Sequence, residues 1–216
     1  MSIVARFAPS PTGYLHLGHA HAALFAWRRA RAAGGRFLLR LEDIDPIRCR
    51  PTFAQAITDD LAWLGLDWDD PVRAQSRHLP EYGAVLDTLA TRGLLYPCFC
   101  TRADIAAAAH APHAPDTTLY PGTCRLLSAD ARAIRLTSGA PYALRLDSAA
   151  ALATIGERLG YEEAREGWVP CHPERFGDVV LGRKDVPASY HLCVTHDDAL
   201  QGVTLVTRGV DLRPAT

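Results

Sequence analysis

Residues 6–19 read RFAPSPTGYLHLGH, and the rest of the chain is best understood outward from this stretch. The apolar run at 3–7 predicts a buried strand, the Pro-Ser-Pro-Thr-Gly segment ends it, and a helical pattern begins near Gly18. A strand that passes through a short loop into a helix presents free backbone N–H groups and the positive helix end. Such a junction favours the binding of a triphosphate.

The H-L-G-H at the end of this stretch has the chemistry expected of a nucleotide site. The imidazoles of His16 and His19 can donate hydrogen bonds to phosphate oxygens and stabilise charge that develops as pyrophosphate leaves. Gly18 lets an adenine ring approach the backbone closely.

Strands and helices alternate along the first part of the chain. The predicted elements are the strands 3–7 and 36–41 and the helices 18–33, 52–64 and 80–92. This alternation implies parallel strands with crossover helices, so the predicted fold class is α/β with a Rossmann-like half. The segments 179–181, 191–194 and 204–207 are predicted to be strands that return to this sheet.

The composition changes at Tyr96, where a cysteine cluster, an alanine-rich helix and a His/Pro loop follow one another. We predict an inserted module at 96–173, between the two halves of a catalytic domain at 1–95 and 174–216. Its Cys98, Cys100 and Cys124 form a C-x-C pair with a distant third cysteine, which is moderately specific for structural zinc.

The fourth zinc ligand stays open on chemistry alone. The candidates are His110, His113 and Cys171. The alternative is a set of three reduced structural thiols that bind no metal.

The composition of the whole chain limits the possible classes of protein. The 216 residues carry a net charge of −1, are 48% hydrophobic and include a single lysine, Lys184. Neither a signal peptide nor an apolar run long enough to span a bilayer is evident, so we expect a cytoplasmic protein. Its six cysteines would then be thiols or metal ligands rather than disulfides. We expect a monomer, and a local basic patch is enough for an RNA partner.

The phrase R-F-A-P-S-P-T-G-x-L-H-L-G-H resembles the signature of class I glutamyl-tRNA synthetases and of their shortened relatives, the glutamyl-Q tRNA(Asp) synthetases. Residues 40–45, RLEDID, are similar to the family phrase R-[IFL]-E-D-x-D, whose glutamate holds the substrate ammonium. Tyr190 and Arg208 stand where the family supplies a tyrosine and an arginine for glutamate. The resemblance covers nearly the whole chain and is close at both ends.

This resemblance implies three sites within a Rossmann-like class I catalytic domain that carries an inserted, zinc-containing module of the acceptor-binding type. The implied glutamate-binding residues are Arg6, Phe7, Ala8, Pro9, Ser10, Glu42, Tyr190 and Arg208. The implied ATP-binding residues are Ser10, Thr12, His16, Gly18 and His19, with His16 and His19 catalytic. A Y-x-x-x-C phrase at 120–124 implies Tyr120 as the fourth ligand of one structural Zn²⁺. ATP would bind with Mg²⁺.

The compact module, the Y-x-x-x-C phrase and the Q-G-V-T run at 201–204 favour the glutamyl-Q branch. That branch implies ATP-dependent activation of L-glutamate as glutamyl-adenylate, and transfer to queuosine in the anticodon of tRNA(Asp). Two local departures are His196, ahead of Asp197 and Asp198, and Val210, where many members have Glu or Ala.

The second class I signature, a K-M-S-K-S-like loop, is expected several tens of residues beyond Arg208. Lys184 lies before Tyr190 and matches an ordinary R-[RS]-x-D strand end instead. The chain is therefore expected to be either a piece of a longer protein or a natural truncation.

Three alternative functions remain. The first is a catalytic-core fragment of an ordinary glutamyl-tRNA synthetase, and the second is a truncated, non-catalytic synthetase-like module that binds glutamate, ATP or RNA. The third is a small-molecule ligase or adenylyltransferase that shares only H-x-G-H. It is disfavoured because Glu42, Tyr190 and Arg208 would then match the family by chance.

Overall fold

A computed structural model describes residues 2–109, 120–156 and 159–210. The chain divides into two compact units. Unit 1 comprises Met1–Tyr82 and Tyr190–Thr216, and unit 2 comprises Gly83–Ser189. The module boundaries inferred from composition, 96 and 173, lie inside unit 2 and stay a prediction.

Unit 1 is built on a parallel sheet whose strands follow the order β1 (Val4–Phe7), β2 (Arg36–Leu41) and β3 (Asp69–Ala74). Helix α1 (Leu17–Ala32) links the first two strands, and α2 (Pro51–Trp63) links the second two. Parallel neighbours need such crossover helices because a tight turn cannot join them. The predicted α/β pattern of parallel strands and crossover helices is confirmed.

The turn from α1 into β2 depends on two glycines. Gly34 has a φ of +62°, a conformation that residues with a side chain rarely adopt. A Cβ on Gly35 would lie 2.2 Å from the Ile3 carbonyl oxygen, so only glycine allows the backbones to approach this closely. The strand therefore begins immediately after the helix ends.

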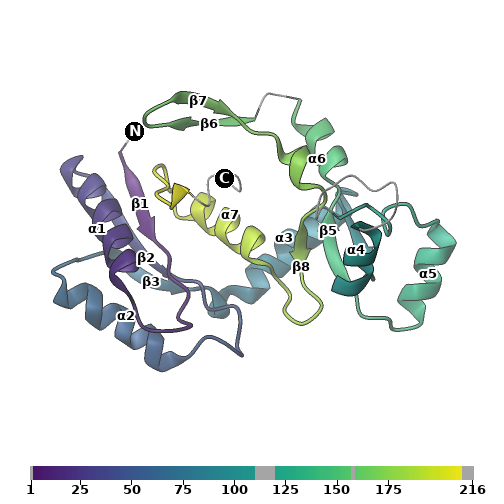
Figure 1. Ribbon diagram of the computed structural model, residues 1–216, viewed down its shortest axis with the longest axis horizontal. Coiled ribbons are helices and arrows are strands. Elements are labelled where there is room, and N and C mark those ends of the chain that lie inside the picture. Colours follow the sequence, from purple (N-terminus) through teal and green to yellow (C-terminus); the bar gives the residue numbers. More distant parts are fainter. Residues whose placement is uncertain (1, 110–119, 157–158, 211–216) are drawn as a thin grey trace. The chain divides into compact units, whose positions relative to one another are not determined.

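Strand β2 has two differently used faces, because successive side chains of a strand point to opposite sides. Phe37, Leu39 and Leu41 join the hydrophobic core together with buried residues of α1 and α2. Arg40, on the opposite face, bonds to residues of α7 (Tyr190–Leu200). Figure 1 shows the strands lying between α1 and α2 on one side and α7 on the other.

Two of the predictions for the end of the chain are corrected in unit 1. The strand predicted at 191–194 is wrong, because these residues lie in α7. Leu192 to Val194 form an apolar run too short to distinguish strand from helix, and Asp197 extends the buried set at helical spacing. The segment 204–207 contributes one parallel bridge, between Leu205 and Ala5 of β1.

Unit 2 contains a mixed set of short elements, with α3 (Leu79–Thr91) crossing into it from unit 1. Its main sheet is antiparallel, in the order β4 (Leu95–Cys98), β5 (Ala143–Leu146) and β8 (Val180–Gly182). The expectation that 179–181 rejoins the parallel sheet is wrong, because β8 pairs with β5 instead.

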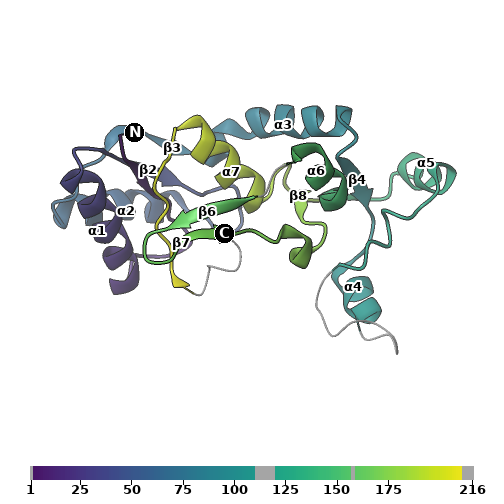
Figure 2. The same ribbon diagram turned by 90° about the horizontal axis from the view of Figure 1, so that it is seen from above.

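The remaining elements are η1 (Gln75–His78) in unit 1 and, in unit 2, α4 (Arg102–Ala109), α5 (Ala129–Thr137), α6 (Ser148–Ile155), β6 (Gly160–Glu163), β7 (Gly167–Pro170) and η2 (Pro173–Phe176). Of these, Figure 2 labels α4, α5, α6, β6 and β7. Strands β6 and β7 form an antiparallel hairpin.

Asp178 joins three parts of unit 2, and sequence reasoning did not single it out. Its buried carboxylate accepts hydrogen bonds from Tyr96 Oη at 2.6 Å and from the Ser148 backbone N–H at 3.0 Å. Arg125 Nη1 donates to the same carboxylate at 3.0 Å. A buried carboxylate needs such partners because its desolvation is otherwise costly.

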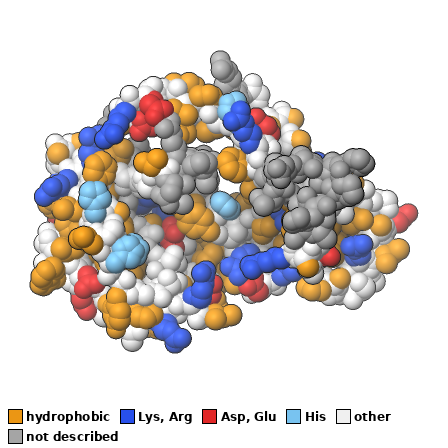
Figure 3. Space-filling view, viewed as in Figure 1, with side chains coloured by type: hydrophobic (Ala, Val, Ile, Leu, Met, Phe, Trp, Pro, Cys, Tyr) orange, Lys and Arg blue, Asp and Glu red, His pale blue; other side chains and the backbone are white. Residues whose placement is uncertain are grey.

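Two surface properties follow from the side chains. In the part of the chain described, no helix is long and apolar enough to cross a membrane. Figure 3 shows basic and acidic side chains interspersed over the face in view, in keeping with a net charge of −1.

Candidate functional site

A cleft of about 380 Å³ lies in unit 1, where β1 and β2 end. Its lining includes every residue that the resemblance implies for glutamate, from the segment 6–10 to Glu42, Tyr190 and Arg208. Carboxyl ends of parallel strands are where open α/β sheets bind ligands. The structure thus brings these side chains together, while their individual roles stay predictions.

The residues predicted to bind ATP lie along the same edge of unit 1. Thr12 and His19 line the cleft together with Ser10, whereas His16 and Gly18 are outside its lining, at the start of α1. Tyr14 and Thr207 also line the cleft, and neither was singled out from the sequence. Tyr14 is 70% exposed and packs edge-on against Phe53 of α2, with ring centroids 5.0 Å apart.

The two histidines cap helix α1 reciprocally. His16 Nδ1 accepts from the Gly18 backbone N–H at 3.1 Å, and His19 Nδ1 accepts from the His16 backbone N–H at 3.3 Å. Their rings stack with centroids 3.8 Å apart. Because both Nδ1 atoms accept, each neutral ring carries its proton on Nε2 and can donate it to a phosphate oxygen.

Burial, and then the neighbouring His16 ring, lower the pKa of His19. The ring is therefore neutral near pH 7. Gly18 serves the same cap, because a Cβ there would lie 2.9 Å from His16 Cε1. The glycine is thus required by the local fold as well as by the predicted approach of adenine.

A cluster of charges lies behind the cleft, on the α7 side of β1 and β2. Arg6 donates to Asp198 from Nε at 3.2 Å and from Nη2 at 3.3 Å. The fully buried Arg40 donates to Asp198 Oδ1 at 2.7 Å and lies 3.5 Å from Glu42 Oε1. The cluster balances two guanidiniums with two carboxylates, which is how buried charges are retained.

Glu42 is buried where it meets the cleft. Burial raises the pKa of Glu42 above its ordinary value, and the Arg40 and Arg6 guanidiniums oppose that rise. A buried carboxylate in a cleft is suited to a cationic ligand such as an ammonium. The positive charge of the ligand compensates for the hydration that the carboxylate loses on burial.

Asp197 has a different environment from its neighbour Asp198. It is fully buried and bonds to Arg73 Nε and Gln75 Nε2, both at 2.9 Å. Tyr82 Oη donates to the same carboxylate at 2.9 Å. The sequence marks both aspartates, but only the structure distinguishes their contacts. Asp197 links α7 to Arg73, Gln75 and Tyr82, whereas Asp198 contacts Arg6, which lines the cleft.

Tyr190 and Arg208 line the cleft and come from near the two ends of residues 190–210, the described part of unit 1 that follows unit 2. Tyr190 begins α7, and Arg208 follows the residues that bridge to β1. The pKa of the adjacent His191 is lowered by burial and then by the charge of Arg208. The guanidinium thus acts electrostatically at this end of the cleft.

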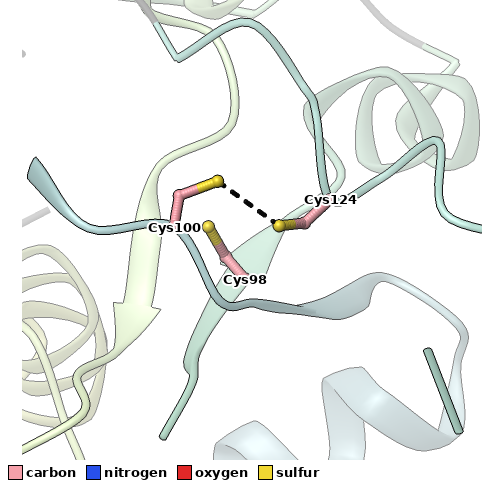
Figure 4. Close-up of side chains that lie close together, drawn as sticks. All are labelled: Cys98, Cys100 and Cys124. Carbon is pink, nitrogen blue, oxygen red and sulfur yellow. Dashed lines mark hydrogen bonds between the residues drawn. The ribbon is translucent and has the colours of Figure 1, made fainter. Parts of the chain in front are cut away.

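The predicted metal-binding cysteines lie close together in unit 2. The sulfurs of Cys98, Cys100 and Cys124 lie within 4.8 Å of one another, and Figure 4 shows them pointing toward a common centre. Cys100 and Cys124 Sγ are 3.5 Å apart. All six cysteines are free thiols.

Tyr120 lies beside this cluster. Its Oη is 3.9 Å from Cys100 Sγ, and the Arg145 guanidinium stands 3.8 Å from its ring centroid. Burial would raise the pKa of Cys124, but hydrogen bonds, led by that from Tyr120, lower it to about 7. Among the other candidates, His110 and His113 lie outside the described residues, and Cys171 does not join the cluster.

Lys184 holds the loop that carries the C-x-C pair. Its Nζ donates to the Phe99 carbonyl at 3.0 Å and to the Cys100 carbonyl at 3.1 Å. This contact lies within unit 2. That Lys184 is not the catalytic lysine of a K-M-S-K-S-like loop stays a prediction.

Comparison with known proteins identifies the class. The family model for the catalytic domain of class I tRNA synthetases (E and Q) matches residues 2–216. A glutamate-tRNA ligase from Elizabethkingia meningosepticum, solved in complex with its amino acid, superposes with a TM-score of 0.81 at 26% identity. The superposition covers 100% of this chain and 45% of that one, so this chain spans less than half of the solved protein.

Sequence relatives narrow the identification from this class to one family. The glutamyl-Q tRNA(Asp) synthetase of Rhodobacter capsulatus is 50% identical over 99% of this chain and 79% of its own length. That of Nitratidesulfovibrio vulgaris is 44% identical, over 99% of this chain and 67% of its own. The chain therefore belongs to the class I (E and Q) tRNA synthetases and, within them, to the glutamyl-Q tRNA(Asp) synthetase family.

Proposed function

We propose that this chain activates L-glutamate with ATP and transfers the glutamyl group to queuosine in the anticodon of tRNA(Asp). The observation that carries the proposal is the cleft, which collects Arg6, Glu42, Tyr190 and Arg208 beside His19. A dicarboxylic amino acid matches this set, because its ammonium can pair with Glu42 and a carboxylate with a guanidinium. The names of the relatives supply the tRNA and the modified base.

In the first step, an oxygen of the glutamate α-carboxylate attacks the α-phosphorus of ATP. The bond from that phosphorus to the bridging oxygen breaks, and pyrophosphate leaves. The Nε2–H groups of His16 and His19 and the amino end of α1 stabilise the growing negative charge. Mg²⁺ carried by ATP would neutralise part of the triphosphate charge.

In the second step, a hydroxyl of the queuosine cyclopentene diol attacks the carbonyl carbon of glutamyl-adenylate. An ester bond forms, the bond between the carbonyl carbon and the AMP phosphate oxygen breaks, AMP leaves with that electron pair, and the hydroxyl proton is released. Glu42 and Arg208 act in this step by holding the glutamyl group, so that its carbonyl carbon stays in place while the queuosine hydroxyl approaches.

We also infer a structural Zn²⁺ in unit 2, held by Cys98, Cys100 and Cys124 with Tyr120 as the fourth ligand. Three convergent sulfurs fit a metal that binds thiolates. The ion would hold the loop after β4 against the segment at 120–124 and take no part in the reaction. About one zinc per chain is expected from protein purified without chelator, and a stable metal-free protein would contradict the site.

Glutamate-dependent exchange between ATP and pyrophosphate, measured without tRNA, tests the activation step. Exchange supports the proposed function. Exchange that appears only with tRNA(Glu) favours the core of an ordinary glutamyl-tRNA synthetase. Glutamate binding by calorimetry with no exchange under any condition favours a synthetase-like binding module.

Transfer is tested separately with radiolabelled glutamate and two preparations of tRNA(Asp). One carries queuosine and its matched control carries guanosine at the same position. Label is expected only in the queuosine-containing tRNA, and equal labelling of both would contradict the assigned acceptor. A monomer stays a prediction, which sedimentation of the same preparation tests.

A further inference from the structure

Two charged side chains that do not line the cleft connect two that do. Arg6 and Glu42 line it, whereas Asp198 and Arg40 are not among its lining residues. The connection runs from Arg6 through Asp198 and Arg40 to Glu42, with neighbouring polar atoms 2.7 to 3.5 Å apart. Arg6 and Glu42, a cation and an anion of the cleft, are therefore connected by one continuous set of contacts.

Asp198 fixes the plane of the Arg6 guanidinium. The carboxylate receives both Nε and Nη2, at 3.2 and 3.3 Å, and so occupies one edge of the planar group. A two-point contact of this kind sets direction as well as charge. The Nη1 side of the guanidinium remains for a carboxylate that enters the cleft.

The same carboxylate also holds Arg40. The Arg40 side chain is fully buried, and its Nη1 donates to Asp198 Oδ1 at 2.7 Å and to Gln201 Oε1 at 3.1 Å. Its Nη2 reaches Glu42 Oε1 at 3.5 Å. A guanidinium with no exposure has few alternative positions, so Asp198 ties Arg6, which lines the cleft, to an arginine that is held in place by burial.

We propose that Asp198 is a positioning residue, which holds Arg6 ready for a carboxylate of the amino acid and, through Arg40, sets the spacing between Arg6 and Glu42. Asp198 itself does not contact the ligand. This inference rests on the proposed function, because it takes an amino acid with two carboxylates as the ligand. The role falls on a residue behind the cleft, and the resemblance of the cleft residues to those of the family does not assign it.

Asp198→Asn provides the test, because an amide of the same size carries no charge and lacks the second acceptor oxygen, Oδ2, which receives Arg6 Nη2. Calorimetric titration should show a glutamate Kd raised about tenfold or more, with the ATP Kd changed less than twofold. Asp67→Asn is the matched control, since Asp67 also pairs with an arginine of unit 1, Arg31, but lies outside the cleft lining. An unchanged glutamate Kd, or an equal weakening of ATP, would overturn the proposal.

The arginine Nε–H resonances give a second measurement that needs no ligand. In the native protein the Arg6 Nε–H is expected to exchange slowly with solvent, because it donates to Asp198. In Asp198→Ala, which removes both acceptor oxygens, that protection should be lost, while the Arg31 signal stays unchanged. Persistence of the Arg6 protection would overturn the positioning role. Failure of the native protein to bind glutamate would overturn the proposed function instead, and the resonances would still report whether Asp198 holds Arg6.

Discussion

The two histidines at the start of α1 show how one short motif provides both a helix cap and a pair of donors. Each Nδ1 accepts a backbone N–H, which leaves each Nε2–H for a ligand. In His19→Ala one donor to the leaving phosphate is lost, so single-turnover adenylation should slow about a hundredfold. The glutamate Kd should hardly change, and unchanged turnover would remove His19 from the transition-state role.

Arg208 is predicted to act on the ligand rather than on the fold. Arg208→Ala removes a guanidinium from the cleft lining, so the glutamate KM should rise far more than the ATP KM in pyrophosphate exchange. Equal increases for both substrates, with a lower unfolding midpoint, would indicate a defect of folding instead.

The raised pKa of Glu42 predicts that glutamate binding depends on pH. Burial raises the pKa of Glu42, so protonation begins at a higher pH than for an ordinary glutamate. The protonated form cannot pair with an ammonium, and the association constant should therefore fall as pH drops through that raised pKa. Burial has the largest effect on this pKa, the Arg40 and Arg6 guanidiniums oppose it, and the Asp198 carboxylate adds to it. The pH dependence of glutamate binding by Glu42→Gln shows how much of the effect comes from the carboxyl groups of the ligand. A profile parallel to that of the native protein would contradict the assignment of Glu42 to the ammonium.

The contact between Lys184 and the C-x-C loop is predicted to support zinc binding. Lys184→Met removes the cation from two carbonyls of the C-x-C loop, so zinc affinity measured by chelator competition should fall about tenfold. Lys184→Arg keeps the charge and should retain most of the affinity. Native-like zinc affinity in the methionine variant would show that the contact does not support the site.

At the scale of elements, α7 carries two adjacent aspartates with different partners. Asp197→Asn disturbs a fully buried carboxylate that binds Arg73, Gln75 and Tyr82, so the free energy of unfolding should fall by about 3 kcal/mol. Asp198→Asn should cost less stability, because Asp198 is 20% exposed. Urea unfolding of the two variants checks the order, and a larger loss for Asp198→Asn would contradict it.

The elements of unit 1 were predictable where apolar periodicity was long. The first two strands and the helices at 18–33, 52–64 and 80–92 appear within one residue of their predicted bounds. Short runs were ambiguous, and 191–194 is helical although it was predicted as a strand. A run of three apolar residues does not distinguish the two periods, so packing onto β1 and β2 selects the helix.

At the scale of the whole molecule, the cysteine cluster and the cleft belong to different units. Chelation of zinc should therefore increase amide exchange at β4 and its neighbours while leaving β1 and β2 protected. Mass spectrometry of exchanged peptides measures both in one sample. Equal loss of protection in both units would show that the ion supports the entire fold.

By itself the sequence determined the first two strands and the three long helices, the junction at 6–19 and the family, because these depend on local periodicity and contiguous motifs. It also marked Arg6, Glu42 and Arg208 as candidates, all of which the structure places in one cleft. Only the tertiary structure decided which charges pair. Arg6 and Arg40 meet Asp198 across 192 and 158 residues of chain, and local patterns report burial but not a partner so distant in sequence.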